Sequence, residues 1–220
     1  MFDESLFTYD AKKHLGYYKG VLIPSVTQLL ELFMPISGDI PLERLEKAAK
    51  RGTDIHADIE RINNLLAESV RFGDQYAIDY AVNMGGATYD YMCLMKVFNL
   101  IPLKYEELVF LLDEMGEPIC YGHFDLIVGC NKTIDPFTGG EAYMTDIKTT
   151  SVFDKVKTAL QTHAYRVAFN QTHKQKLLQQ TFGIWLRDGV KLIPLELLED
   201  NYIIEFYKTL RRLWNVKGKD

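Results

Sequence analysis

Two aspartates and a lysine, Asp125, Asp146 and Lys148, lie on two apolar segments that have the pattern of successive strands. The midpoint between the two aspartates falls between Asp135 and Pro136, at the centre of a turn-forming cluster. A hairpin folded about that point sets Asp125 opposite Asp146. Lys148 emerges on the same face as Asp146, because alternate residues of a strand point to the same side. The spacing therefore predicts two carboxylates and one ammonium at one place on a sheet.

This trio is costly to bury without a further cation. Burying carboxylates side by side among apolar strand residues costs roughly several kcal/mol. A bound divalent cation removes the cost, and hard oxygen ligands favour magnesium or manganese over zinc, which prefers histidine and cysteine. A lysine beside such an ion can orient or help to deprotonate a water nucleophile and can offset charge that develops on a phosphate. The chemistry that fits is attack of water on a phosphate ester.

The composition is that of a folded soluble protein. The chain has 220 residues, of which 47% are hydrophobic and 25% charged, with 15 Gly and 7 Pro. These values favour one domain and exclude disordered and fibrous classes. No run approaches the ~18 apolar residues of a membrane span, and the first residues lack a secretory signal. With Cys93, Cys120 and Cys130 forming no CxxC pair, we expect reduced thiols and a cytoplasmic protein.

Basic charge is concentrated in the last third of the chain. Residues 1–145 hold 12 basic and 22 acidic side chains, whereas residues 146–220 hold 13 and 8. Two interpretations stay open: a surface that faces phosphates, or a solvated helix face with a basic tail. Charge alone favours the solvated face. The clustered cations are Lys155, Lys157, Arg166, Lys174, Lys176, Lys208, Arg211, Arg212, Lys217 and Lys219.

The period of apolar residues predicts the order of the elements. Helices are expected from the capping box at Ser25 to before Pro35, from about Leu42 to Ser69, and from about Asp74 to Leu100 with a kink or break at Gly85-Gly86. Strands are expected at Tyr105–Leu112, Ile119–Val128 and Ala142–Thr149. A helical period returns from about Asp154 to Arg187, with strands at Gly183–Leu186 and Val190–Leu195 and a last helix at Glu199–Trp214. The pattern predicts a single α+β or mixed α/β domain over 1–220, with a mostly helical part (1–101), a catalytic sheet and helix (102–195), and a helix with a basic tail (196–220).

Four short motifs follow one another along the chain: Gly-x-x-x-His at Gly52–His56, Gly-x-x-Asp at Gly122–Asp125, Asp-x-Lys at Asp146–Lys148, and Gln-x-x-x-Tyr at Gln161–Tyr165. In this order they resemble the PD-(D/E)XK nuclease superfamily and, within it, the RecB-like exonuclease branch of phage recombination nucleases. The resemblance covers about residues 51–170, and Ile23–Leu32 is similar to the Pro-Ser-Val-Thr opening of phage members. It implies a restriction-endonuclease-like core, with helices flanking a central mixed sheet that contains an antiparallel three-strand meander.

The resemblance also implies a metal site for Mg²⁺ or Mn²⁺. The implied ligands are His56, Asp125, Asp146 and the carbonyl of Ile147. A glutamate is expected on the strand before Asp125; Glu106 and Glu107 both stand there, and we favour Glu107, although Glu107 could merely pair with Lys104. No iron–sulfur cluster is expected, because members with a cluster use four cysteines that flank the core.

The remaining motif residues are implied to serve catalysis. Lys148 would be the catalytic lysine, and Gln161 with Tyr165 would orient that lysine or the DNA strand. Residues four apart share one helix face, which agrees with such a joint role. Gly52 is expected where the helix backbone approaches its neighbour closely.

The function expected from the resemblance is magnesium-dependent hydrolysis of DNA in recombination, repair or phage DNA processing, in a bacterial or phage-infected cell. Exonuclease character follows from the resemblance alone. The expected partner is DNA, as single strands or duplex ends, with a single-strand annealing or binding protein and an oligomer as further expectations. The alternative is a DNA-binding or assembly protein on a nuclease scaffold with little or no cleavage. Such a protein would lack the lysine or a metal carboxylate, and neither is missing here.

Overall fold

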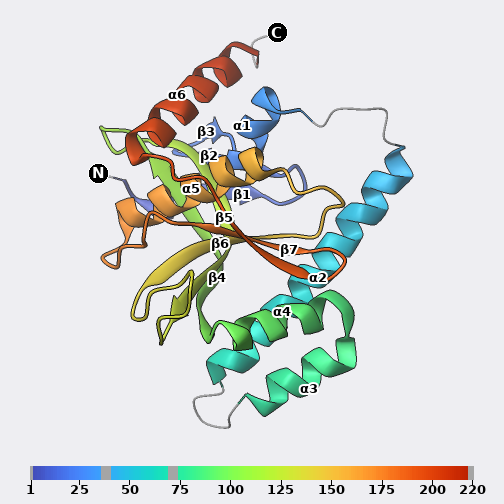
Figure 1. Cartoon of the computed structure of the whole chain (residues 1–220). Helices are drawn as coiled ribbons and strands as arrows, with labels where there is room; N and C mark the ends of the chain where they lie inside the picture. Colours follow the sequence, from blue (N-terminus) through green and yellow to red (C-terminus); the bar gives the residue numbers. More distant parts are fainter. Residues whose placement is uncertain (1, 36–40, 69–73, 218–220) are drawn as a thin grey trace.

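A mixed five-stranded sheet forms the centre of the computed structural model, which describes residues 2–35, 41–68 and 74–217 (Figure 1). Its strands, in spatial order, are β4 (Leu100–Leu112), β5 (Pro118–Cys130), β6 (Ala142–Lys148), β7 (Phe182–Leu186) and β8 (Val190–Pro194). The strands β4, β5 and β6 form an antiparallel meander, β7 runs parallel to β6, and β8 is antiparallel to β7. Because parallel neighbours need a crossover, the chain passes through α5 (Lys155–Thr172) between β6 and β7. The predicted α+β class and the three-strand meander are confirmed.

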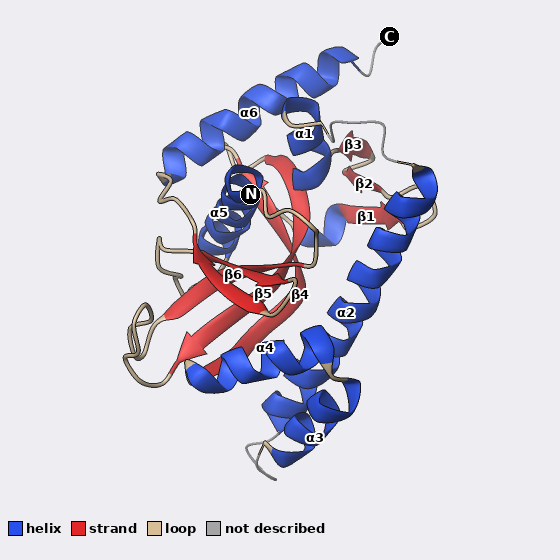
Figure 2. Ribbon diagram, turned by 45° about the vertical axis from the view of Figure 1, so that its right-hand side comes forward, coloured by secondary structure: helices blue, strands red, loops and turns tan. Residues whose placement is uncertain are grey.

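Helices cover both faces of this sheet (Figures 1 and 2). On one face lie α1 (Val26–Phe33), α5 and α6 (Asp200–Lys217), with Leu29, Met144 and Phe169 in a shared core. On the other face lie α2 (Leu42–Glu68), α3 (Gln75–Met84) and α4 (Gly86–Val97), where Ile62 and Ile184 are fully buried. The sheet is thus buried on both sides, which holds its strands rigidly for any site that they carry.

The N-terminal part contains four α-helices in its described residues, as its mostly helical prediction requires, but its first residues also form strands that were not predicted. After a short 3-10 helix (Glu4–Leu6), β1 (Phe7–Asp10), β2 (Leu15–Tyr18) and β3 (Val21–Ile23) form an antiparallel sheet of their own. Its strands have only three or four residues, and the left-handed turn positions include His14 and Lys19 rather than glycine alone. Neither the period nor the turn chemistry of these strands gives a strong sequence signal. Packing of Tyr18 and Ile23 against β4 and β5 holds the sheet in place.

The predicted helix starts and breaks agree with the structure where it describes them. Ser25 caps α1 through a complete capping box with Gln28. The long helix expected from Asp74 divides into α3 and α4, because Gly85 and Gly86 both have positive φ, 64° and 52°. The predicted end of the second helix at Ser69 lies outside the described residues.

Helix α5 is shorter than the helical period that was predicted to reach Arg187. It ends at Thr172, and the chain then runs as an irregular segment to β7. Asn170 binds both backbone groups of Leu177, and the Leu178 N–H donates to the carbonyl of Ala142 at 3.1 Å. These contacts hold the chain in the return path that a strand parallel to β6 requires, so tertiary contacts override the local period.

Several of the clustered C-terminal cations are used inside the fold. Arg166 is buried and pairs with Asp200, Lys208 pairs with Glu114 and Glu205, and Arg211 donates to the carbonyl of Leu22 at 2.9 Å. Because it is buried, Arg166 belongs neither to a surface that faces phosphates nor to a solvated helix face; Lys219 lies outside the described residues. In the described ranges, every helix is too short or too polar to cross a membrane.

His163 is a fully buried histidine in α5 that the fold holds neutral. Its Nε2 lies 2.8 Å from the carbonyl of Glu196, so Nε2 donates, and Nδ1 accepts from Arg166 Nε at 3.3 Å. A proton on Nδ1 would face the guanidinium. Burial, reinforced by the charge of Arg166, lowers the pKa of His163 to about 4.

We expect the stability of the protein to fall between pH 6.5 and pH 4 because of His163. The unfolded state, with a histidine pKa of ~6.5, takes up a proton that the native state excludes, so this contribution is complete above pH 6.5 and is lost toward pH 4. The linkage amounts to about 3 kcal/mol. Denaturant unfolding of His163→Gln should show a shallower fall than wild type over this range, with His14→Gln, at an exposed histidine, as the control. Equal slopes in wild type and His163→Gln would contradict the assignment.

Candidate metal centre

Asp125 and Asp146 occupy neighbouring positions where the β5–β6 ladder ends. The ladder pairs Leu126 with Thr145 and Ile127 with Met144, and the next position in this register sets Asp125 opposite Asp146. The predicted hairpin register is therefore confirmed. Beyond the ladder, the Ile147 N–H donates to Asp125 Oδ2 at 2.6 Å, which ties the carboxylate to the neighbouring strand. The structure thus engages the amide of Ile147, while a role for its carbonyl stays a prediction.

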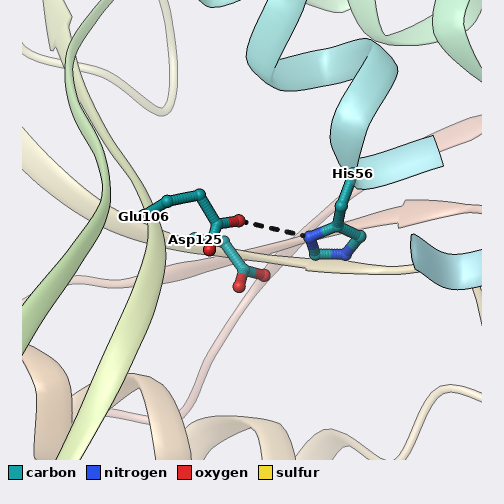
Figure 3. A group of neighbouring side chains, drawn as sticks. All are labelled: His56, Glu106 and Asp125. Atoms are coloured by element: carbon teal, nitrogen blue, oxygen red, sulfur yellow. Dashed lines mark ion pairs between the residues drawn. The ribbon is translucent and has the colours of Figure 1, made fainter. Parts of the chain in front are cut away.

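His56 and Glu106 complete a group of possible metal ligands with Asp125 (Figure 3). One ligand atom from each of the three residues lies within 4.8 Å of the others. His56 reaches the sheet from α2, and its Nδ1 lies 3.5 Å from Glu106 Oε1. The group joins a helix and two strands that are far apart in the sequence, and the predicted placement of His56 beside Asp125 is confirmed.

The glutamate at this centre is Glu106, which corrects the preference for Glu107. Both carboxylate oxygens of Glu107 instead accept from Lys104 Nζ at 2.8 Å, the pairing that was the open alternative. The reason is a local break in β4: Glu106 has a positive φ of 50° and lies between the ladder pairs Tyr105–Leu126 and Glu107–Phe124. A left-handed residue inside a strand redirects its side chain, and here it turns Glu106 toward His56.

Asp146 is buried with an oxygen that the described part of the chain leaves without a partner. Its side chain is 1% exposed; Oδ2 lies 2.8 Å from Lys148 Nζ in an ion pair, and neither oxygen makes a hydrogen bond. Burying an ionised carboxylate without hydrogen bonds raises the free energy of the folded state. The unpartnered Oδ1 is the observation that fits a cation, because a metal ion would satisfy it. Asp146 is nevertheless not a member of the group of His56, Glu106 and Asp125 whose ligand atoms lie within 4.8 Å of one another.

The pKa shifts of the residues at the centre are consistent with a cation site. Burial and then the charge of Asp146 raise the pKa of Asp125 to about 7. Burial opposes protonation of His56, but the hydrogen bond to Glu106 and the charge of Asp125 outweigh it and raise the pKa of His56. Burial likewise lowers the pKa of Lys148, but the charges of Asp146 and Asp125 outweigh burial and raise this pKa. The raised pKa values of His56 and Lys148 reflect the nearby carboxylates, whose negative charge a divalent cation would neutralise.

A chain of hydrogen bonds from α5 holds Lys148. Its Nζ donates to Gln161 Oε1 at 3.2 Å, and Gln161 Nε2 donates to the Tyr165 hydroxyl at 3.1 Å. The Tyr165 ring lies against Gly122, where a Cβ would come within 2.4 Å of the ring. The structure therefore brings together three of the four motifs through direct contacts, and it places Gln161 on the lysine itself.

The first motif also meets the others. A Cβ on Gly52 would lie 3.3 Å from Thr149 Oγ1, so α2 passes close to the segment that follows Lys148. The expected close approach at Gly52 is confirmed.

One neighbour of the centre was not predicted from the sequence: Trp185, on β7, pairs in parallel register with Lys148. Parallel pairing across a helix leaves no local signal that could have revealed it.

Comparisons with known proteins add little to this geometry. No protein-family model matches the chain, and no curated protein matches its sequence. Among solved structures, the chain is similar to the crystal structure of SSO0001, with 14% sequence identity over 85% of this chain and 82% of that chain and a TM-score of 0.37. A likeness at this level supports no conclusion about function, which therefore rests on the geometry of the centre.

The neighbouring glutamates offer a matched test of the metal centre. Glu106→Gln removes a carboxylate from the ligand group, so we expect its affinity for Mn²⁺, measured by calorimetric titration, to fall about tenfold or more. Glu107→Gln removes the same charge one residue away, where it only pairs with Lys104, and should leave the Mn²⁺ affinity within about twofold of wild type. These sizes follow from the ~1.4 kcal/mol per tenfold change that a lost charged ligand readily exceeds. Equal losses in both variants would show that general charge, rather than ligation, governs binding.

Proposed function

We propose that the protein is a DNA nuclease that requires a divalent metal ion, magnesium or manganese, and hydrolyses phosphodiester bonds. The observation that carries the proposal is the buried Asp146 carboxylate, which has an unpartnered oxygen beside Asp125 and an ion pair with Lys148. This is the trio that the hairpin spacing predicts. Phosphate chemistry is the use that fits carboxylates and an ammonium at one place.

The donor set supports magnesium or manganese. His56, Glu106 and Asp125 are within reach of one another, and Asp146 lies beside Asp125, so carboxylates outnumber the single imidazole. Hard oxygen donors suit these ions, whereas structural zinc sites use several cysteines or histidines. A bound ion would supply activation of a water molecule and neutralisation of phosphate charge.

The chain's own residues would orient the substrate. Lys148 Nζ lies at the edge of the carboxylates, where it can donate to a phosphate oxygen or to the attacking water. Gln161 and Tyr165 limit the positions open to the ammonium, because each link of that chain is a hydrogen bond to a group of α5. Such restraint favours a fixed reacting geometry.

DNA as the substrate rests on the resemblance of the four motifs. The alternative, a binding or assembly protein on a nuclease scaffold, is disfavoured because the lysine and both aspartates are present, with Lys148 paired with Asp146 and Asp125 bound to the Ile147 amide. Exonuclease character, an annealing partner and an oligomer stay predictions from the resemblance.

The direct test is incubation with end-labelled linear DNA and closed circular DNA, with magnesium or with EDTA. We expect cleavage only with magnesium; loss of linear DNA alone indicates an exonuclease, and nicking of circles an endonuclease. Binding without cleavage under every condition would contradict the proposal and support the assembly protein.

Two variants test the roles at the centre. Asp146→Asn should abolish magnesium-dependent cleavage, because it replaces a buried ligand with a neutral isostere. Lys148→Ala should lower the cleavage rate by several orders of magnitude and leave Mn²⁺ affinity close to wild type, because the ammonium is not a ligand. Lys132→Ala, at an exposed lysine in the turn after β5, is the control. Full turnover by pure Asp146→Asn protein would remove the metal assignment.

Gln161 provides a subtler test, because it acts through Lys148. Gln161→Leu removes the partner of the ammonium, and a hydrogen bond to a charged group corresponds to about tenfold in rate. We expect the cleavage rate constant to fall by about that factor at saturating DNA with unchanged Mn²⁺ affinity. Gln171→Leu, also on α5, loses hydrogen bonds to the backbone of Leu112 and should lower thermal stability without lowering this rate constant. An unchanged rate in Gln161→Leu would show that the amide does not position the lysine.

A further inference from the structure

An aromatic side chain lies directly beside the candidate lysine. The parallel register of β6 and β7 pairs Lys148 with Trp185, and the antiparallel register of β7 and β8 pairs Trp185 with Lys191. Residues paired in register point to the same side of a sheet, and neighbouring strands are ~4.8 Å apart. Lys148, Trp185 and Lys191 therefore form a row across three strands, on the side of the sheet that carries Asp146.

The ring of Phe153 lies beside this row, next to the pair formed by Asp146 and Gly183. Asp146 pairs with Gly183, and the Phe153 ring occupies the place of the missing side chain, since a Cβ on Gly183 would come within 2.4 Å of that ring. The Phe153 and Trp185 rings are 5.9 Å apart and tilted by 51°. The Trp185 indole also donates to the carbonyl of Thr150 at 2.8 Å. The two rings are thus held in fixed orientations at the border of the carboxylates.

The surface around these rings is apolar and cationic. Val152, next to Phe153 in the chain, is 75% exposed. Lys191 Nζ lies 4.6 Å from the centroid of the Trp185 ring, and in the described part of the chain this ammonium has no ion pair or hydrogen bond. Rings and methyl groups suit a nucleobase, and a mobile ammonium suits the phosphate of the same nucleotide.

We propose that Trp185 and Phe153, with Lys191, form a stacking platform for an unpaired base next to the scissile phosphate, which makes a single-stranded or frayed DNA end the substrate. The inference rests on the proposed function for the position of that phosphate. Trp185 is one strand from Lys148, so a nucleotide attached to a phosphate at the carboxylates reaches the ring. A base inside a duplex has both faces covered by its neighbours, so it does not stack here, whereas an unpaired base does.

The test compares two oligonucleotides with the same phosphates. A fluorescent dT12 and a fluorescent abasic 12-mer are bound to protein in the Asp146→Asn background, which prevents cleavage, and anisotropy gives the affinities. Adding Trp185→Ala should weaken dT12 binding about tenfold or more and leave abasic binding within twofold. Adding Trp185→Phe, which keeps a ring, should retain dT12 binding within about threefold. Adding Tyr202→Ala, at an exposed aromatic on α6, is the control and should change neither.

A spectroscopic measurement avoids dependence on whether Trp185→Ala folds. The chain has 2 Trp, so Trp214→Phe in the Asp146→Asn background leaves Trp185 as the only indole. Stacking predicts that dT12 quenches its fluorescence and that the abasic 12-mer does not. Equal quenching by both, equal loss of both affinities, or no effect of Trp185→Ala would overturn the platform and leave Trp185 as a support for the loop after β6.

Failure of the platform and failure of the proposed function give different results. If wild-type protein does not cleave DNA but Trp185 still distinguishes dT12 from the abasic strand, the platform stands and the nuclease proposal falls. If wild-type protein cleaves DNA and Trp185 makes no such distinction, the platform is wrong and the nuclease proposal stands.

Discussion

Two carboxylates brought together across the β5–β6 hairpin are the constraint on which the rest of this structure depends. Asp146 is almost fully buried, and Asp125 lies opposite it in the ladder register. The protein offsets part of their repulsion with the Lys148 ammonium, the Ile147 amide and the nearby His56 imidazole. An oxygen of Asp146 is nevertheless left unpartnered in the described structure. Buried polar groups are rarely left without a partner, and the divalent cation that we propose would satisfy this oxygen.

The neighbours of these carboxylates come from separate elements, and each depends on a different feature of the fold. A left-handed residue in β4 turns Glu106 toward the centre, α2 brings His56 over the sheet, and α5 holds Lys148 through Gln161. Two buried cores, one on each face of the sheet, hold these elements in position. A site assembled in this way is as rigid as the sheet, which suits chemistry that depends on fixed geometry.

The centre has two chemically different borders. Toward β4 and α2 it is bounded by acidic and imidazole groups, whereas toward β7 and β8 it is bounded by Trp185, Phe153 and Lys191. Part of the basic charge in the last third of the chain is used inside the fold, as the buried Arg166 side chain, which pairs with Asp200, shows. Net charge by region therefore does not by itself identify a surface that faces phosphates.

The amino-acid sequence by itself determined the features that depend on near neighbours. Hairpin symmetry about Asp135-Pro136 set the register of the aspartates, the capping box set the start of α1, and Gly85-Gly86 divided a long helical pattern. These are local effects of turn chemistry, periodicity and backbone freedom. The four motifs have a different basis, because the resemblance implied their roles; in the structure Lys148 contacts Asp146 and Gln161, and His56 lies near Asp125.

Only the tertiary structure decided the features that depend on distant contacts. The choice of Glu106 over Glu107 required one strand residue to take a left-handed backbone opposite Asp125. The early end of α5 and the N-terminal sheet follow from packing against the central sheet rather than from their own periods. Trp185 meets Lys148 through a parallel pairing across a crossover helix. Such pairings are set by how whole elements pack, which no short segment of the sequence encodes.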